Sequence, residues 1–219
     1  MASSDRPTSL DPITTGPVAG SVPDPVADVL DLFASRGDGH YGEAVDQRRH
    51  ALQSATLAMA DGADDGLVAA ALLHDIGHLL SRPDRGAPVD GSVDDHHESI
   101  GARWLAPRFG PDVARVVALH VTAKRYRCTV DPAYRAALSP ASIRSLVVQG
   151  GPLSERVAIR FAAHPGFDRA IALRGWDERA KDPDTRTPDF EEFVPILQRV
   201  RSAVSNPPPR GDRSGRSTG

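Results

Sequence analysis

The amino-acid sequence predicts an all-α protein that folds as one domain. Apolar residues recur at helical spacing through most of residues 25–204, and no segment alternates apolar and polar residues convincingly over the length of a strand. The two ends of the chain, residues 1–24 and 205–219, are rich in Pro, Ser and Gly instead. We expect these ends to be disordered tails, because they hold too few apolar side chains to offset the entropy of ordering.

Three helices are predicted in the first part of the domain. Asp24 can cap the first helix, and Pro25 suits its first position, where a proline's missing amide would be unpaired anyway. The apolar run Leu67–Leu73 indicates a buried helix, for which Asp64 or Asp65 provides a cap. The three helices are expected at about residues 25–36, 43–59 and 66–80.

The second part of the domain follows a loop rich in Pro, Asp and Gly at residues 81–93. Pro111 sits well at a helix start, and the remaining periodic segments are short. Helices are expected at about residues 95–108, 111–123, 139–147, 153–163, 167–173 and 188–203.

Composition limits the classes of function. The net charge of −3 gives no basic excess for binding nucleic acid or an acidic membrane surface. No stretch approaches the ~20 apolar residues that a membrane-spanning helix needs, and the first residues lack the pattern of a signal peptide. The single cysteine, Cys128, excludes an intrachain disulfide and fits a reducing compartment, so we expect a cytoplasmic protein.

Histidines are concentrated in one part of the chain. Seven of the eight lie between residues 40 and 120, each on or beside a predicted helix, and His74 and His120 stand within apolar runs. One buried histidine is usually a core residue with a hydrogen-bond partner. Several of them with an adjacent Asp, separated by helix-length gaps, are better explained by a shared site for Fe, Mn, Zn or Mg, which satisfies every group at once.

The adjacent pair His74 and Asp75 is the most specific element. Two neighbouring residues of a helix diverge by about 100°, so this pair can serve two ions or bridge between them. His74 and His78 share a helix face, as the two histidines of a zinc protease motif do. The residue after His74 is Asp, however, which is too short to act as the general base of such a protease.

The order of these residues resembles the ligand pattern H…HD…H…H…D of the HD-domain superfamily. That superfamily includes metal-dependent phosphohydrolases and phosphodiesterases, and also diiron oxygenases such as myo-inositol oxygenase. The resemblance alone assigns Asp177, which lies too far along the chain for spacing to place it. It implies six metal ligands: His50, His74, Asp75, His97, His120 and Asp177.

Longer strings resemble the PhnZ- and TmpB-like branch of mixed-valent diiron oxygenases. The likeness covers about residues 38–182, and its H-V-x-A-K-R-Y, Q-G-G-P and R-x-W-D-E strings are more selective than the HD pair. The matching segments are Tyr41–Gln53, Ala70–His78, His97–Ala102, His120–Tyr126, Leu138–Ser142, Gln149–Pro152 and Arg174–Glu178.

This branch implies O₂-dependent cleavage of the C–P bond of a 1-hydroxyphosphonate, with an Fe(II)/Fe(III) pair as cofactor and a 2-oxoglutarate-dependent hydroxylase as a functional partner that supplies the substrate. Two alternatives remain open. The first is an HD phosphohydrolase or phosphodiesterase that acts on a phosphate substrate with Mn or another divalent metal and needs no O₂. The second is a non-catalytic HD protein that binds a nucleotide or a partner protein.

Four residues are expected to contact the substrate. Lys124 follows His120 by one helical turn, so its ammonium group either reaches over the metals to a phosphonate oxygen or is a solvated lysine at a helix end. The resemblance places Glu43 near a substrate amine and Ser142 among the phosphonate contacts, and His78 is assigned to the substrate as well.

The chain departs from the branch near residue 40. The branch carries a tyrosine, beside or transiently on the iron, two positions before the Gly of its G-E pair, where this chain has His40; Tyr41 follows one position later. We expect one of the two to gate the site. The frame H-E-x-x-G-A selects His97 as the ligand and leaves His96 at the surface or behind the ligands.

Overall fold

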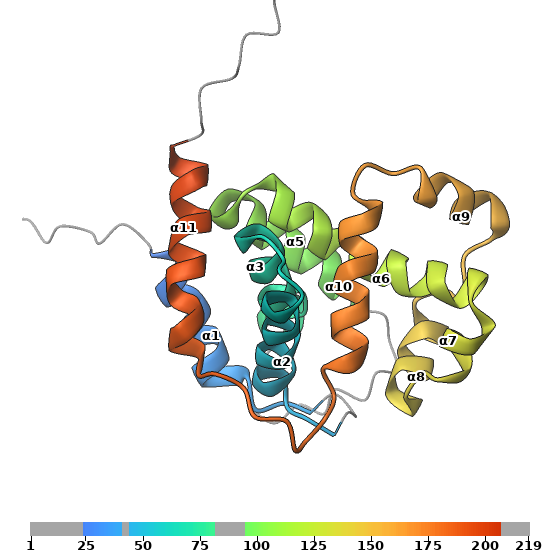
Figure 1. Ribbon diagram of the computed structural model, residues 1–219, viewed down its shortest axis with the longest axis horizontal. Coiled ribbons are helices and arrows are strands. Elements are labelled where there is room, and N and C mark those ends of the chain that lie inside the picture. Colours follow the sequence, from blue (N-terminus) through green and yellow to red (C-terminus); the bar gives the residue numbers. More distant parts are fainter. Residues whose placement is uncertain (1–23, 41–43, 82–94, 207–219) are drawn as a thin grey trace, which may run out of the picture.

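The computed structural model describes residues 24–40, 44–81 and 95–206 (Figure 1). Within these residues the protein contains 11 α-helices, one short 3-10 helix and no strand, which confirms the expected all-α class. The expected tails lie outside the described residues except for Asp24, Ser205 and Asn206, and so does nearly all of the expected loop at 81–93.

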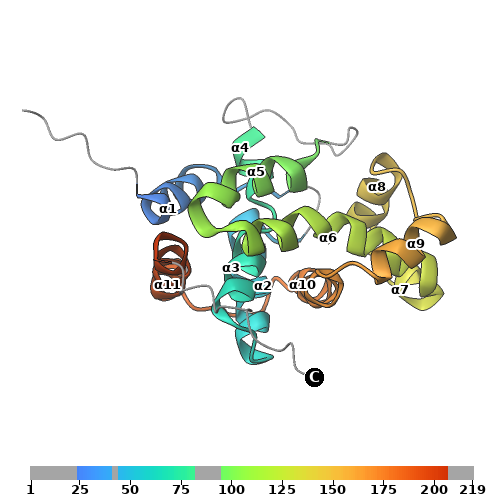
Figure 2. The ribbon, with the colours of Figure 1, turned by 90° about the horizontal axis from the view of Figure 1, so that it is seen from above.

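The longest helix, α6 (Pro111–Val130), runs through the middle of the molecule (Figure 2). The helices that pack most extensively against it are α5 (His97–Phe109), α10 (Phe167–Arg179) and α3 (Asp65–Leu73). The helix α2 (Gln47–Ala60) packs on α3 and α10. His50, His97 and His120 lie on three of these five helices, and His74 directly follows α3.

The main hydrophobic core lies between these helices and a second group that includes the first and last described helices. Figure 1 shows α1 and α11 side by side at one edge of the molecule. The rings of Phe33 and Phe190 are in contact there, with centroids 4.7 Å apart, and both side chains are buried. This group consists of α1 (Pro25–Arg36), α4 (Ile76–Ser81), the 3-10 helix η1 (Phe190–Phe193) and α11 (Val194–Ser205).

Three short helices gather around the far end of α6 (Figure 2). They are α7 (Pro132–Ala136), α8 (Pro140–Val148) and α9 (Glu155–Ala162). The sequence did not predict α7, whose five residues are too few to show a period; Asp131 caps it through the amide of Tyr134. Two small apolar clusters, separate from the main core, hold this end together.

The helix expected at residues 66–80 is the main error in the prediction. It is interrupted at His74 and Asp75, which form a turn between α3 and α4. The apolar run continues across this interruption, so periodicity could not reveal it. Helix α2 also begins later than expected, at Gln47, because Asp46 caps it through the amide of Arg49.

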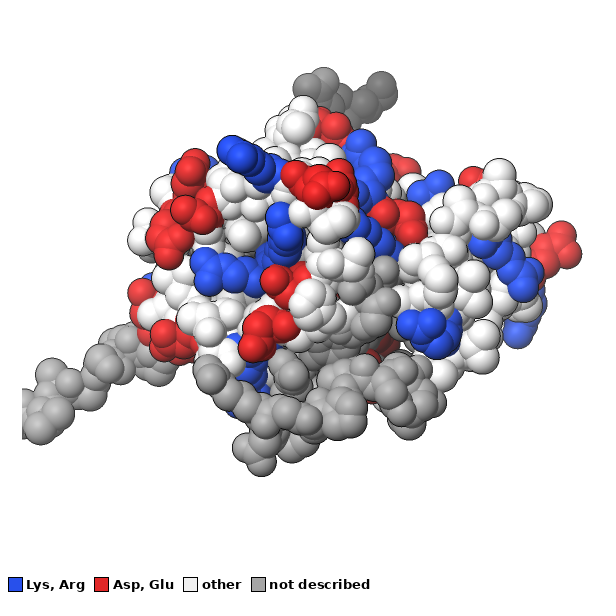
Figure 3. Space-filling view, turned by 90° about the horizontal axis from the view of Figure 1, so that it is seen from below, with Lys and Arg blue, Asp and Glu red and all other residues white. Residues whose placement is uncertain are grey.

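The outer surface carries both signs of charge. On the face in Figure 3, Lys and Arg side chains are interspersed with Asp and Glu side chains. Among the helices that the structure describes, none is long and apolar enough to cross a membrane.

Candidate metal centre

The structure brings the six expected ligands together from five parts of the chain. His50 lies on α2, His97 on α5, His120 on α6 and Asp177 on α10, while His74 and Asp75 form the turn between α3 and α4. All are buried except Asp75, which is partly exposed. Ionisable groups at this depth need partners, and they supply them for one another.

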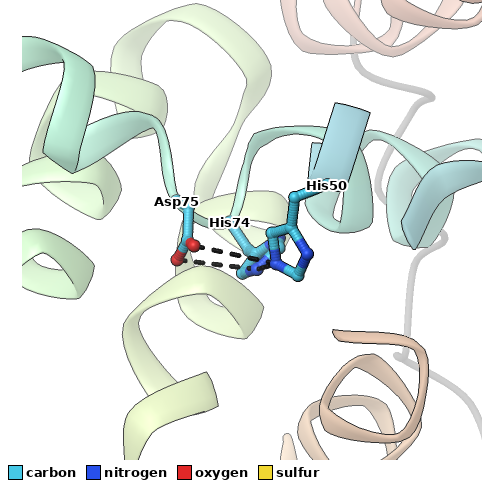
Figure 4. Close-up of side chains that lie close together, drawn as sticks. All are labelled: His50, His74 and Asp75. Atoms are coloured by element: carbon cyan, nitrogen blue, oxygen red, sulfur yellow. Dashed lines mark hydrogen bonds and ion pairs between the residues drawn. The ribbon is translucent and has the colours of Figure 1, made fainter. Parts of the chain in front are cut away.

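One group contains His50, His74 and Asp75, which point toward one another in Figure 4. The Nε2 atoms of His50 and His74 are 3.2 Å apart. Asp75 places Oδ2 3.8 Å from Nε2 of His50 and Oδ1 3.5 Å from Nε2 of His74. Asp177 Oδ1 approaches Nε2 of His50 to 3.4 Å from the other side. This group therefore offers two imidazoles and two carboxylates.

A second group contains Asp75, His97 and His120. The Nε2 atoms of His97 and His120 are 3.1 Å apart, and each lies 3.5 Å from Oδ1 of Asp75. That oxygen is also 3.5 Å from Nε2 of His74. Asp75 is thus shared by both groups, in the position that a bridging carboxylate would occupy.

The hydrogen bonds of the four rings test whether a cation fits here. Each Nδ1 faces an oxygen that only accepts, so Nδ1 carries the hydrogen and Nε2 of a neutral ring presents a lone pair. Two lone pairs about 3 Å apart repel, whereas a cation between them attracts both. The donor set therefore fits metal ions. The Nδ1 acceptors are Ala180 O for His50 (2.8 Å), Ala71 O for His74 (2.9 Å), Asp95 Oδ1 for His97 (3.0 Å) and Val117 O for His120 (2.7 Å).

A proton on one ring of a pair also relieves the repulsion between the two Nε2 lone pairs. Burial alone would lower the pKa of His50, but the hydrogen bond and the charge of Asp177 raise it above its usual value. The pKa of His97 is raised as well, because Asp95 and Asp75 outweigh burial. The pKa of His120 falls well below its usual range through burial and the neighbouring rings. Each pair thus contains one ring that holds a proton more readily than a free histidine.

Both carboxylates of the centre stay ionised. Burial opposes their charge, but the surrounding imidazoles hold the pKa of Asp75 far below its usual range. For Asp177 the largest favourable effect on the charged form comes from Arg174, which again keeps the pKa well below normal. Permanent negative charge at these two positions favours cations in both groups.

Asp95 is a supporting residue that the sequence reasoning missed. Its carboxylate contacts Nδ1 of His97 through Oδ1 and Nδ1 of His78 through Oδ2, at 3.0 and 2.6 Å. The rings of His78 and His97 are stacked, with centroids 3.9 Å apart. His96 adopts a left-handed backbone (φ 51°) between Asp95 and His97. An acidic residue two positions before a ligand histidine was the signal that could have revealed this contact.

A buried ionic network holds Asp177. Arg174 donates to Asp177 and Glu178 on its own helix, and its Nε donates to the hydroxyl of Tyr134 at 2.6 Å. These three oxygens compensate a guanidinium group that is almost fully buried. From the sequence, Arg174 is only part of the R-x-W-D-E string and has no assigned role.

The expected substrate residues have different surroundings. Lys124 is buried, so it is not a solvated lysine at a helix end, and its Nζ donates to Ser145 Oγ at 2.9 Å. Burial, aided by the charge of Arg174, lowers its pKa to about 8. Ser142 is buried on α8, near Lys181. His78 lies beside the second group, as described above.

Two of the expected site residues lie outside the described residues. They are Tyr41, expected to gate the site, and Glu43, expected to contact the substrate. His40 is described and is exposed at the surface after α1. Which of His40 and Tyr41 takes the family position therefore stays a prediction.

Comparisons with known proteins identify the family. Residues 48–151 match the HD domain. The chain is 41% identical to a [1-hydroxy-2-(trimethylamino)ethyl]phosphonate dioxygenase (glycine-betaine-forming) of Leisingera caerulea, over 77% of this chain and 86% of the relative. It is 40% identical to a hydroxymethylphosphonate dioxygenase of Gimesia maris, over 77% and 84%. An uncharacterized protein of Acanthamoeba polyphaga mimivirus is 32% identical over 70% and 71%. The chain therefore belongs to the HD-domain family and, within it, to the group that contains these two dioxygenases.

Proposed function

We propose that this protein is an O₂-dependent oxygenase that cleaves the C–P bond of a 1-hydroxyphosphonate and releases phosphate and a carboxylate. The observation that carries this proposal is the 40–41% identity to two dioxygenases named for such substrates, over most of both chains. The reaction balances with one O₂ per substrate. The carbon loses its bonds to hydrogen and phosphorus, and the two products together contain both atoms of O₂.

Two iron ions, Fe(II) and Fe(III), are the proposed cofactor. His50, His74 and Asp177 would hold one ion, His97 and His120 the other, and Asp75 would bridge them. Support comes from the two groups of facing Nε2 atoms and from the contacts of Asp75 with both. Bound iron would supply the one-electron steps with O₂ that no side chain here can perform.

Side chains of α6 and α8 would bind and orient the phosphonate. Lys124 stands one turn beyond His120 and keeps its positive charge below a pH of about 8, so it can neutralise a phosphonate oxygen. Ser142 offers a buried hydroxyl on the facing helix. His78, oriented by Asp95, lies beside the second group, where its ring can contact the substrate. These contacts would hold the carbon–phosphorus bond beside the metals.

The substrate must carry its 1-hydroxyl group before it reaches this enzyme. We propose that a 2-oxoglutarate-dependent hydroxylase installs it. Glu43 is proposed to contact the substituent on the phosphonate carbon, and His40 or Tyr41 to gate the site.

The test measures O₂ consumption and phosphate release together. Iron-loaded protein is given hydroxymethylphosphonate or [1-hydroxy-2-(trimethylamino)ethyl]phosphonate, with and without O₂. We expect one O₂ consumed per phosphate released and no phosphate under anaerobic conditions. Equal phosphate release without O₂ would identify a hydrolase and overturn the proposal. Failure with both substrates, and with other 1-hydroxyphosphonates, would also overturn it.

A further inference from the structure

The chain uses lysine only twice. Of its 26 basic residues, 24 are arginines, and the two lysines are Lys124 and Lys181. Lysine differs from arginine in presenting a compact charge with three rotatable donors in place of a flat fork. A chain that otherwise uses arginine throughout therefore places this compact cation at two positions only.

Both lysines contact the same face of the same helix. Lys124 on α6 donates to Ser145 Oγ at 2.9 Å, and Lys181, just beyond α10, donates to Ser142 Oγ at 2.8 Å. Ser142 and Ser145 are one turn apart on α8, so their side chains are neighbours. A cation on α6 and a cation in the segment after α10 thus meet at two adjacent hydroxyl groups.

The hydroxyl groups have different roles in this arrangement. Ser145 uses its hydrogen on the carbonyl oxygen of Ser142, at 3.1 Å. Ser142 Oγ accepts from Lys181, and among the residues that the structure describes its own hydrogen meets no acceptor. A hydroxyl that accepts a bond from an ammonium group is a stronger donor. Ser142 is therefore prepared to donate to an anion.

The backbone around Lys181 is fixed by the helix that carries His50. The preceding carbonyl, Ala180 O, accepts from Nδ1 of His50. The following residue, Asp182, exchanges two backbone hydrogen bonds with the buried side chain of Gln53, at 2.6 and 3.2 Å. Lys181 is the one residue between these two anchors, so its position is tied to the metal centre.

We propose that Lys181 is a second anion-binding lysine of this site, which acts with Lys124 to hold the phosphonate group of the substrate at Ser142 and Ser145. This inference rests on the proposed function for the identity of the anion. It adds a residue that none of the motifs above assigned to the substrate. Two ammonium groups match a phosphonate, which carries up to two negative charges.

A purely structural role for Lys181 is the competing explanation. Its Nζ also lies 3.3 Å from Oε1 of Glu178, and the side chain is 14% exposed. An ion pair of this kind could simply fasten the end of α10. The two roles differ in one measurable respect. Only an anion-binding lysine becomes shielded from a chemical reagent when a phosphonate binds.

The scarcity of lysine makes that difference easy to measure. Iron-loaded protein is acetylated briefly under anaerobic conditions, with methylphosphonate or with sodium chloride at equal ionic strength. Mass spectrometry then follows two side chains, with the amino terminus as an internal reference. At about ten times the dissociation constant of methylphosphonate, labelling of Lys181 should slow about ten-fold. An unchanged rate at Lys181 would overturn the inference.

Variants provide a second test. Lys181→Met should weaken methylphosphonate binding at least ten-fold, the usual effect of losing a charge-assisted hydrogen bond, and Lys181→Arg should restore part of the affinity. Arg179→Met removes an exposed cation two positions away and should bind as the wild type does. Unaltered binding by a folded Lys181→Met protein would refute the proposal. If that variant does not fold, labelling of the wild type decides.

The result is separable from the test of the proposed function. Protection of Lys181 without O₂-coupled phosphate release would support the anion site and contradict the proposed reaction. Normal turnover and normal affinity in Lys181→Met would support the proposed reaction and contradict this role of Lys181.

Discussion

Gly77 and His97 are packed backbone to backbone, and a β-carbon at position 77 would stand 1.9 Å from the carbonyl oxygen of His97. The atoms in the way belong to the main chain, so no side-chain rotation can relieve the clash. Helix α4 can therefore lie this close to α5 only with glycine at position 77. The position of the ring of His97, a proposed metal ligand, depends on this contact.

Gly77→Ala should separate α4 from α5 and move His97 away from His120. We expect loss of metal from the second group and a lower melting temperature, both measured on purified protein. Gly175→Ala is the matched control, because a β-carbon there meets nothing within 4 Å and alanine favours a helix by roughly 0.5–1 kcal/mol. A Gly77→Ala protein with full metal content would show that α5 can shift without displacing the ligand.

Asp75→Ala should remove both metal ions, because Asp75 contacts the imidazoles of both groups. His120→Ala should weaken only the second group. Metal content per chain, measured by atomic emission after dialysis, compares the two variants. Two ions retained in Asp75→Ala would show that this carboxylate does not bridge.

Metal affinity should fall as the pH falls, beginning above pH 6.5. The pKa values of His50 and His97 are raised in the folded protein, so protons occupy these rings at a higher pH than in free histidine and compete with metal. For each histidine ring from which metal must displace a proton, the metal affinity falls about ten-fold per pH unit below the pKa of that ring. Calorimetry in two buffers with different ionisation enthalpies counts the protons released; a count of zero at pH 7 would contradict this assignment.

Asp95→Asn should weaken metal binding by about 10–100-fold, the usual effect of removing a carboxylate that orients a ligand histidine. The amide has one accepting oxygen, so it cannot serve both His78 and His97. Asp112→Asn, at an exposed position on α6, is the control and should have no effect. Equal metal affinities of Asp95→Asn and the wild type would mean that Asp95 only accepts a hydrogen bond from the amide of His97 at the start of α5.

The sequence predicts an element correctly where the signal for it is local. Caps such as Asp24, and prolines at helix starts such as Pro111, marked boundaries that the structure has. The turn at His74 and Asp75 escaped it because the break leaves the apolar pattern unchanged. Helix α7 escaped it because a single turn shows no periodicity.

The candidate site shows the same division. Histidines in apolar runs revealed that buried polar groups needed a shared partner, which is a local observation. The contact of Lys181 with Ser142 and the contact of Asp95 with His78 join residues far apart in sequence, and only the folded chain creates them. No sequence pattern pairs Lys181 with Ser142, which lies 39 positions earlier.

The hydrogen bond from His50 to Ala180 joins residues 130 positions apart. Closing so long a loop costs conformational entropy, so this bond depends on the packing that brings the two halves of the domain together. A metal centre oriented by that bond cannot exist in a partly folded chain. Under the proposed function, iron would therefore bind the complete fold in preference to partly folded chains, and the melting temperature would rise with the free iron concentration. A cell with little iron would hold this protein in a form more open to proteolysis.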